Sequence, residues 1–437
     1  MLIYTSMVSR TTAAALPLFD AEPTPHPDMP FEQVVERFAC AGAPTAMARL
    51  SVPLGADDGV SVPVFTNEFW TARQRAAHSL HEVSYRACFK PQLPRFFIER
   101  LSAPGDVVYD PFMGRGTTLV EAALLERAAY GCDVNPLSRV LCEPRLHPPS
   151  LAEIHAALGA VDFTDAGELP EDLLVFYHPR TLGQICALRR HLLDRERAGT
   201  LTRAERWIRM VAVNRLTGHS PGFFSVYTLP PNQAVSPRAQ AKINASRKQT
   251  PEPRDVKAII LRKSRALLAD VSAYVRATLD RLAPYHRLVT GQASAVVDLP
   301  DGSAALAVTS PPFLDVVQYK TDNWLRCWFI GIDSATVPVT MARRVEAWQE
   351  FVRHTLSDVR RVLRPGGHIA FEVGEVRGGA VRLEEVVIPA GVAAGLDPVL
   401  VLINAQAFTK TANCWGVANN RKGTNSNRVV LLRKSAV

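Results

Sequence analysis

A short run of residues near position 310 combines hydrogen-bond acceptors with a rigid backbone and an aromatic ring. Ser310 follows the apolar stretch LAVT and precedes Pro311, Pro312 and Phe313. The Ser310 hydroxyl oxygen and the Pro311 carbonyl are two acceptors that can face the two N–H groups of an exocyclic amine. Consecutive prolines fix φ and hold the strand-end carbonyl outward, and Phe313 offers a face on which a flat ring can stack. Because Ser-Pro-Pro-Phe is also an ordinary turn, its meaning depends on its surroundings.

A glycine-bearing turn lies upstream, in the sequence DPFMGRGTT. Gly114 and Gly116 closely follow the β-rich stretch VVYD, where a chain reversal next to a ligand needs residues without a Cβ. We expect the two threonines that follow to cap the next helix. Asp133 stands about 20 residues on, where a carboxylate can accept both hydroxyls of a ribose. Two alternatives stay open: the glycines form a structural turn, or Asp133 caps the helix after it.

Each motif stands at the end of a predicted strand, in a chain where strands and helices alternate. The β-rich runs are VVYD (107–110), AAYGCD (128–133), LAVTS (306–310), HIAFEVGEV (368–376), DPVLVLINAQAF (397–408) and NRVVLLRK (427–434). Helical patterns cover 67–101, 117–128 and 348–363. Helices between strands imply an α/β fold with a largely parallel sheet covered on both faces. The loop between the last two strands is too short for a parallel crossover, which predicts an antiparallel C-terminal strand.

Four segments make up the expected domain organisation. Residues 1–60, rich in Pro, Ala and small residues, are expected to be a partly disordered N-terminal extension. Residues 61–150 hold the glycine turn and 288–437 hold the Ser-Pro-Pro-Phe motif. Between them, 151–287 form a large, mainly helical insertion. The helices predicted within it include one long helix over 254–282.

Positive charge is concentrated in the insertion. Between residues 180 and 290 there are 21 Lys and Arg against 7 Asp and Glu, a net of +14. The whole chain carries a formal +8, so the rest of it is mildly acidic. A basic segment on an acidic body is typical of binding to a phosphate backbone. The alternative is a solvated, Arg-rich helical surface without a ligand.

Composition describes an ordinary globular chain of 437 residues, with 47% hydrophobic and 21% charged residues. No apolar run reaches the roughly 18 residues of a membrane helix, and the start lacks a secretory signal pattern. Seven scattered cysteines form no C-x-x-C pair, which argues against a disulfide framework and a structural zinc site. We therefore expect a cytoplasmic protein without a bound metal.

The glycine turn and the segment upstream of it resemble motifs of a known enzyme family. DPFMGRGTT resembles the cofactor motif of the amino-methylating DNA methyltransferases, which implies a Rossmann-like class I methyltransferase sheet and S-adenosyl-L-methionine as cofactor. The resemblance implies cofactor-binding roles for Asp110, Phe112, Gly114, Gly116, Thr117 and Asp133. The upstream sequence YRACFKPQLPRFFIERL is similar to the segment that closes over the methionine end of that cofactor. It makes Lys90 and Pro91 candidates, with Phe89 and Gln92 beside them, although core packing would explain Phe89 equally well.

The sequence TSPPF is similar to the catalytic motif of the same family, S/D/N-P-P-Y/F. The resemblance implies that Ser310, Pro311, Pro312 and Phe313 hold the target amine and its base, which is flipped out of duplex DNA. Serine at position 310 favours N4 of cytosine over N6 of adenine. The sequence has no Pro-Cys dipeptide, which disfavours the covalent cysteine mechanism of cytosine C5 methylation.

Two features depart from the family pattern. Gln292 stands where the family often has an acid that contacts the cofactor adenine, although its amide can still bind that amine. The insertion also precedes the Ser-Pro-Pro-Phe motif, an order similar to the alpha arrangement of these enzymes only in outline. Its role in DNA target recognition is therefore inferred from charge and position.

Near the C-terminus, a polar cluster could line the base pocket or touch phosphates, or could simply be loop chemistry. Its members are Asn413, Trp415, Asn419, Asn420, Lys422 and Asn425.

The partners implied by the resemblance are duplex DNA and a cognate restriction endonuclease. Two other hypotheses stay open: a base amino-methyltransferase acting on RNA, and a nucleic-acid-binding protein that keeps the fold without activity. The intact Gly114, Gly116, Asp133 and SPPF argue against the second of these.

Overall fold

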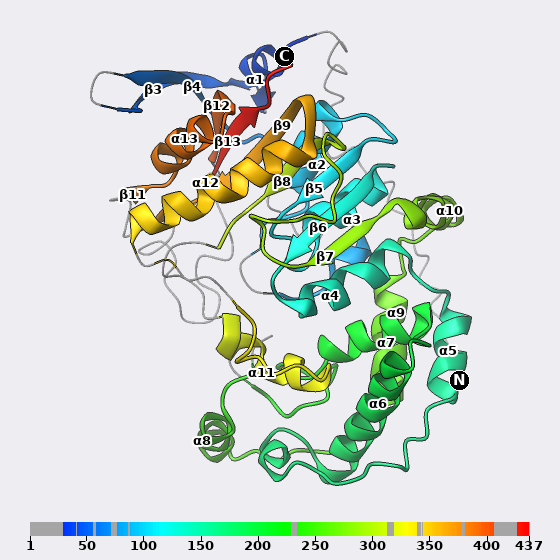
Figure 1. Ribbon diagram of the computed structural model, residues 1–437. Coiled ribbons are helices and arrows are strands. Elements are labelled where there is room, and N and C mark those ends of the chain that lie inside the picture. Colours follow the sequence, from blue (N-terminus) through cyan, green and yellow to red (C-terminus); the bar gives the residue numbers. More distant parts are fainter. Residues whose placement is uncertain are drawn as a thin grey trace, which may run out of the picture.

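The computed structural model has one extended sheet with helices on both faces and a separate helical body beside it (Figure 1). It describes residues 29–40, 42–55, 58–70, 77–85, 88–228, 234–312, 319–338, 342, 344–376, 381–405 and 426–436.

Nine strands of the described residues form the main sheet. In order across it they are β3 (Ala46–Pro53), β4 (Gly59–Asn67), β12 (Asp397–Ala405), β13 (Ser426–Arg433), β9 (Leu363–Val373), β8 (Ala304–Thr309), β5 (Val107–Asp110), β6 (Ala128–Asp133) and β7 (Arg287–Thr290). Strands β9, β8, β5, β6 and β7 are parallel neighbours, whereas β13 runs antiparallel to both β9 and β12. This confirms the predicted Rossmann-like α/β sheet with an antiparallel C-terminal strand. Two short antiparallel pairs lie outside it: β1 (Ala39–Cys40) with β2 (Ala43–Pro44), and β10 (Glu375–Val376) with β11 (Val381–Arg382).

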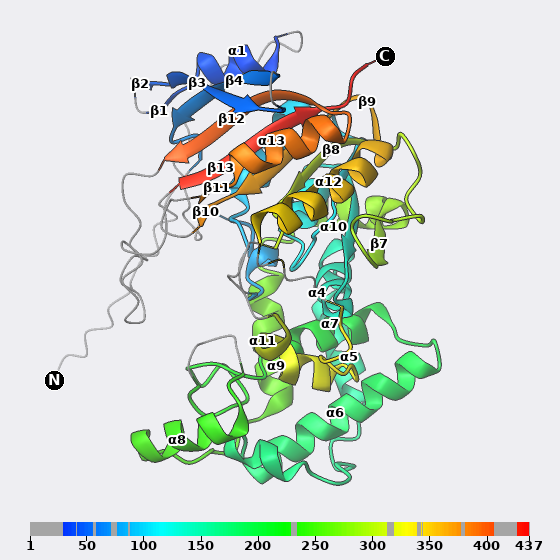
Figure 2. The same ribbon diagram turned by 60° about the vertical axis from the view of Figure 1, so that its left-hand side comes forward.

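Helices cover the two faces of the sheet with separate apolar cores. One face carries α2 (Gln92–Leu101), α3 (Thr117–Leu124) and α4 (Pro136–Leu146) (Figure 1). The other carries α12 (Val345–Val362) and α13 (Glu384–Ala393), which lie in front of the sheet in Figure 2. Trp348 and Leu356 of α12 are buried in the same cluster as Phe371 of β9. The helix expected over 67–101 is confined to α2. The described residues before it form only the short 3-10 helix η2 (Ser79–His81).

The N-terminal segment is more ordered than the sequence suggested. After α1 (Phe31–Glu36), strands β3 and β4 extend the sheet, and β4 pairs in parallel with β12. Within 1–60, α1 and β3 are therefore ordered elements rather than parts of a loose extension, while residues 1–28 lie outside the described part. The sequence did not indicate β3 and β4 because its Pro- and Ala-rich composition resembles a linker. In addition, β12, which pairs with β4, lies more than 300 residues away in the sequence (Trp70 and Asn404 are 334 apart).

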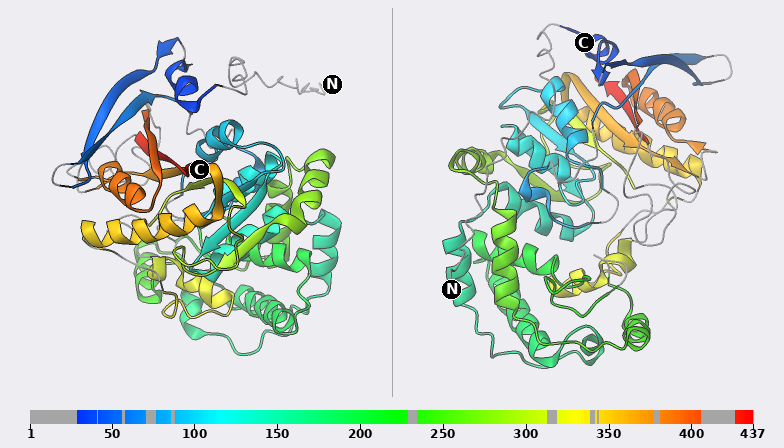
Figure 3. Two further views of the ribbon diagram at one scale, coloured as in Figure 1. Left: turned by 45° about the horizontal axis from the view of Figure 1, so that its top comes forward. Right: turned by 180° about the vertical axis from the view of Figure 1, so that it is seen from behind.

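Most of the insertion forms the second body, seen below the sheet in Figure 1 and from behind in Figure 3, whereas α10 (Ala273–Leu282) lies beside the sheet and packs on α3. Its helices are α5 (Leu151–Gly159), η3 (Glu171–Val175), α6 (Pro179–Arg197), α7 (Arg203–Val213), α8 (Pro237–Arg247), α9 (Val256–Leu267), α10 (Ala273–Leu282) and η4 (Ala283–Tyr285). The single helix expected over 254–282 is divided into α9 and α10, because Ser272 caps a new helix by accepting from the Val275 amide.

Helix α11 (Tyr319–Phe329) follows the Ser-Pro-Pro-Phe motif in sequence but packs on the insertion. The indole N–H of Trp324 donates to the Ala234 carbonyl at 2.9 Å, and Arg189 of α6 donates to the Trp328 carbonyl at 2.8 Å. The insertion body therefore includes a helix from the segment 288–437. No helix of the described residues is long and apolar enough to cross a membrane.

Candidate functional site

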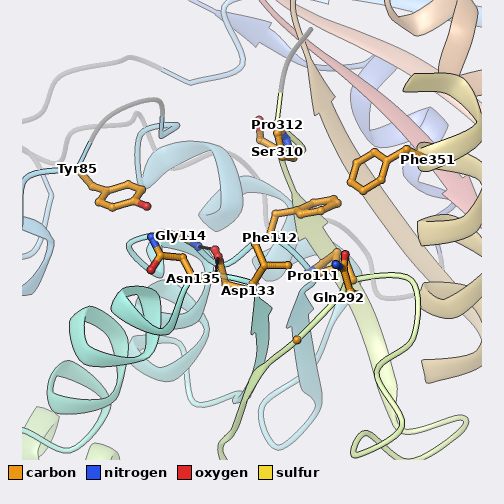
Figure 4. A pocket seen from close by; sticks show the side chains of 13 residues that line it. Tyr85, Pro111, Phe112, Gly114, Asp133, Asn135, Gln292, Ser310, Pro312 and Phe351 are labelled. Atoms are coloured by element: carbon orange, nitrogen blue, oxygen red, sulfur yellow. Dashed lines mark hydrogen bonds between the residues drawn. The ribbon is translucent and has the colours of Figure 1, made fainter. Parts of the chain in front are cut away.

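A cavity of about 720 Å³ lies at the carboxyl ends of β5, β6 and β8 (Figure 4). Its lining residues are Tyr85, Pro111, Phe112, Gly114, Asp133, Val134, Asn135, Gly291, Gln292, Ala293, Ser310, Pro312 and Phe351. A smaller cavity of about 310 Å³ shares Tyr85, Phe112, Gly114 and Ser310 with it. Strand order reverses at β5, and ligands of open α/β sheets bind at such a point.

The glycine turn brings the backbone to both cavities. Gly114 has φ +46°, and a Cβ there would lie 3.7 Å from the Tyr85 ring. Gly116 has φ +73° and is the N-cap residue of α3, and a Cβ on it would lie 2.4 Å from Cys142 Sγ. Both positions therefore require glycine, one next to the ligand space and the other for packing.

Neither threonine caps α3, contrary to the sequence expectation. Gly116 occupies the cap position and offers no side-chain acceptor. Thr118 instead donates to the Val308 carbonyl at 3.0 Å and ties α3 to β8. Thr117 accepts a hydrogen bond from Arg115 Nε at 3.1 Å and lines the smaller cavity.

Asp133 presents a carboxylate to the larger cavity from the end of β6. One oxygen accepts from the Gly114 amide at 2.9 Å and the other from the Asn135 amide at 2.8 Å. Asn135, not Asp133, is the N-cap of α4. Burial raises the pKa of Asp133, and the remaining lone pairs of the carboxylate favour partners that donate hydrogen bonds. The vicinal hydroxyls of a ribose fit that donor requirement.

Asp110 connects the two sequence motifs. Its Oδ1 accepts from the Thr309 hydroxyl at 2.6 Å and from the Phe112 amide at 3.0 Å, and the side chain is 2% exposed. Burial raises the pKa of Asp110 to about 7, and these hydrogen bonds partly oppose that rise. The contact holds the end of β8, and with it Ser310, against the end of β5. Asp110 also lines the smaller cavity.

The Ser-Pro-Pro segment lies at the junction of the two cavities. Ser310 lines both, and Pro312 lines the larger one. The indole N–H of Trp348 donates to the Pro312 carbonyl at 2.9 Å, which fixes the turn from α12. Pro311 between them is buried and is not among the lining residues of either cavity, and Phe313 lies outside the described residues.

Two aromatic rings form an apolar wall opposite Asp133. The Phe112 and Phe351 ring centroids are 5.7 Å apart at an interplanar angle of 41°. Gln292 follows β7 and lies beside this pair in the cavity lining (Figure 4). A flat heterocycle at this position would have an apolar face on one side and an amide group within the same lining.

Of the other candidate residues from the sequence, some line a cavity and others do not. Phe89 lines the smaller cavity, whereas Lys90 and Pro91, at the start of α2, are not among the described lining residues of either. Burial lowers the pKa of Lys90. Gln92 is the first residue of α2, and the C-terminal polar cluster from Asn413 to Asn425 lies outside the described residues.

Sequence reasoning missed Tyr85, Trp348, Phe351 and Glu372. The helical pattern over 348–363 predicted a buried face but not that Trp348 and Phe351 reach the motif. The one sign of Glu372 in the sequence is an acidic residue within a mainly apolar strand. It is 7% exposed, receives a hydrogen bond from the Ser310 hydroxyl, and accepts from Asn427 Nδ2 at 3.0 Å.

A third cavity, of about 1,430 Å³, lies between α4 of the sheet body and α6 and α7 of the insertion. Its charged lining residues are Arg139, Arg189, Arg197, Arg206, Arg209, Glu143 and Glu196. The Arg209 and Glu196 side chains pair at 2.6 Å. Arginines exceed acids among these residues, so the cavity favours an anionic ligand. No group of three His, Cys, Asp or Glu residues in the described part of the chain could hold a metal ion.

Comparison with known proteins supports the resemblance. Residues 59–138 match the model of the N6_N4_Mtase family, described as DNA methylase. The chain is 33% identical over 86 residues to the type II methyltransferase M.MjaII of Methanocaldococcus jannaschii, covering 20% of this chain and 16% of the relative. It is 30% identical over 111 residues to M.MvaI of Kocuria varians, covering 25% and 23%. The solved structure of TrmN from Thermus thermophilus is similar at 13% identity and a TM-score of 0.30, covering 82% of this chain and 51% of that one.

The segment that matches the family model carries the glycine turn and Asp133. The aligned residues span only 16% of M.MjaII and 23% of M.MvaI. The resemblance to DNA amino-methyltransferases, predicted from the motifs, is thus confirmed for this part of the chain.

Proposed function

We propose that this protein is an S-adenosyl-L-methionine-dependent DNA methyltransferase that modifies N4 of cytosine in duplex DNA. The observation that carries the proposal is the junction of the two cavities at Ser310. The cavity with Asp133 and the glycine turn meets the acceptor-bearing Ser-Pro-Pro segment there. A donor held at one end therefore faces an amine held at the other.

The cofactor supplies a methyl group on a sulfonium when bound. Asp133 would accept from its ribose hydroxyls, and Gln292 would bind its adenine amine next to the Phe112–Phe351 pair. Gly114 allows the backbone to come close to it, and Gly116 stays a candidate from the motif although its Cα faces Cys142. The smaller cavity, with Asp110, Phe89 and Thr117, is the space for its methionine end. Lys90 and Pro91, at the N-terminal end of α2, stay candidates for binding the cofactor.

Ser310 and the Pro311 carbonyl would hold the two N–H groups of the target amine. An exocyclic amine conjugated to its ring is a poor nucleophile because its lone pair is delocalised. Two acceptors hold the nitrogen as it pyramidalises, and orientation of methyl and amine in line supplies most of the acceleration. Phe313 would stack on the flipped base. Serine at 310 favours cytosine N4, and adenine N6 is the alternative.

Duplex DNA as substrate is supported by charge. The insertion carries a net +14 over 180–290, and the arginine-lined cavity lies where the insertion meets the sheet body. Arginines at that junction can neutralise phosphates on a duplex whose flipped base reaches Ser310. Because two of the relatives are type II methyltransferases, we also propose a restriction endonuclease as functional partner and a role in restriction-modification in the cytoplasm.

The test is transfer of labelled methyl groups from S-adenosyl-L-methionine to duplex DNA by the purified protein. Ser310→Ala should lower transfer at least about 100-fold, the lower end of what a positioned group contributes, and leave cofactor affinity unchanged. Sequencing that reads modified bases in DNA from expressing cells then assigns the base, the atom and the recognition sequence. Labelling of tRNA or rRNA without labelling of DNA would refute the DNA assignment and favour an RNA base methyltransferase.

A further inference from the structure

Glu372 is a buried acid directly behind the Ser-Pro-Pro motif. It lies on β9, where Phe371 is the register partner of Thr309 on β8, so Glu372 is next to Ser310. Its neighbours along β9, Phe371 and Val373, belong to the apolar core of the opposite face. An acid that is 7% exposed within such a strand is costly to bury unless its partners satisfy it.

Those partners come from the two strands on either side of β9. The Ser310 hydroxyl donates from β8, and Asn427 Nδ2 donates from β13 to Oε1 at 3.0 Å. Asn427 is in turn the register partner of Asn404 on β12, whose side chain binds both backbone groups of Trp70. Ser310, Glu372, Asn427 and Asn404 thus form a row of polar side chains across four strands. Hydrogen bonds to the Trp70 backbone hold the far end of this row.

We propose that Glu372 fixes the Ser310 hydroxyl as an acceptor for the target amine and takes up, through that hydroxyl, the proton that the amine releases. This inference rests on the proposed function. A hydroxyl has one hydrogen and two lone pairs. Because the hydrogen is committed to Glu372, only the lone pairs face the base site. A base that presents an amine is accepted there, and one that presents a keto oxygen is rejected.

The proton balance follows the same path. The amine nitrogen forms a bond to the methyl carbon as the carbon–sulfur bond breaks, and the bonding pair stays on sulfur. The methylated nitrogen is then cationic and gives one proton to Ser310 Oγ. Ser310 passes its own hydrogen to the Glu372 carboxylate, so that serine is regenerated and the acid is neutral. Solvent removes that proton when the product leaves.

Electrostatics around Glu372 favour this uptake. Burial raises the pKa of Glu372, while the Ser310 and Asn427 hydrogen bonds only partly oppose the rise. Both groups in contact with it are neutral. The nearby charge on β13, Arg428, pairs with Glu384 of α13, and Asp110 is two strands away on β5, bound to Thr309. Glu372 is thus a positioning residue whose carboxylate gains a proton more readily than an exposed one.

The experiment measures single-turnover methyl transfer to duplex DNA as a function of pH. Glu372→Gln preserves size and can still accept from Asn427, but its amide donates to Ser310 and cannot take a proton. We expect at least about a 100-fold lower rate, as for loss of general-base assistance. The wild-type rate should fall at low pH, and this fall, the acid limb of the pH profile, should be absent from the variant. That limb falls as pH drops through the raised pKa of Glu372. Glu372→Asp keeps the carboxylate and should restore the limb and part of the rate.

The matched control is Glu385→Gln on α13, an acid with a side chain 37% exposed that pairs with Arg382. It should behave as wild type, and all variants should keep cofactor affinity and thermal stability. A Glu372→Gln enzyme with the wild-type rate, or one that is slower but keeps the wild-type acid limb, would overturn the inference alone. A wild-type enzyme that binds cofactor but never labels DNA would overturn the proposed function and this inference together.

Discussion

Replacing Asp110 with asparagine tests how the cofactor motif and the Ser-Pro-Pro segment are held together. Two of its contacts, from the Thr309 hydroxyl and the Phe112 amide, go to Oδ1, and the Thr118 side chain is a third hydrogen-bonding partner. The amide oxygen of asparagine can keep both, so Asp110→Asn removes the titration and preserves the link between β5 and β8. The variant therefore isolates the cost of a buried acid.

The magnitude follows from the pKa of Asp110, which burial raises from 3.8 to about 7. Between these pH values the folded protein keeps a proton that the unfolded chain has released, so the free energy of unfolding falls as pH rises. At about 1.4 kcal/mol per unit, the loss is about 4 kcal/mol across that interval. Asparagine has no such proton, so the stability of the variant relative to wild type should rise by about 4 kcal/mol from pH 4 to pH 7.

The measurement is urea unfolding of both proteins at several pH values, and the quantity compared is the difference in their free energies of unfolding. Asp58→Asn, the same replacement at an exposed position in the β3–β4 turn, is the matched control. A constant difference for Asp110→Asn would refute the reasoning, because it would mean that Asp110 ionises equally in the folded and unfolded chain.

Two further predictions concern the residues around the motif. Gly116→Ala should cost about 1–2 kcal/mol for its left-handed backbone plus about 1–3 kcal/mol for overpacking against Cys142, whereas Gly105→Ala, with φ +89° and no atom within 4 Å, should cost only the backbone part. If urea unfolding shows equal losses of unfolding free energy for the two variants, overpacking against Cys142 is contradicted. Trp348→Phe removes the donor to the Pro312 carbonyl and should slow methyl transfer without changing cofactor affinity, while Trp207→Phe, which removes a hydrogen bond to Ser264 in the insertion, should leave the rate unchanged. Equal effects on the rate would show that Trp348 does not act through the motif.

The central strands could be predicted because their information is local. Runs such as VVYD and AAYGCD are short and β-rich, and they end at the turn or acid that the structure places at the strand end. Asp133, Gly114 and Ser310 could be brought to one place because parallel strands end at the same edge of a sheet. The sequence could not give Trp348 or Phe351, since helical periodicity predicts which face is buried and not which carbonyl or cavity a side chain reaches.

Some sequence predictions were wrong because the structure depends on residues far apart in the sequence or on local interactions that compete with the predicted ones. β4 is specified by its pairing with β12, which no window of neighbouring residues contains. The threonines after Gly116 have the right type for a cap, but the backbone makes Gly116 itself the cap residue and leaves Thr118 to bind β8. After Leu267 the chain leaves the helix for five residues, and Ser272 caps α10, within a pattern that is typical of one continuous helix.

The pairing of β4 with β12 also determines when the sheet can be completed during synthesis. Trp70 and Asn404, which join the two regions, are 334 residues apart. Strand β4 is therefore made long before its partner emerges from the ribosome, and its hydrogen-bonding edge has no sheet to join until then. Such long-range closure is slow and leaves strand edges open to other chains. In a nascent chain, we therefore expect the open edge of β4 to be a site where unwanted pairing with other chains can begin.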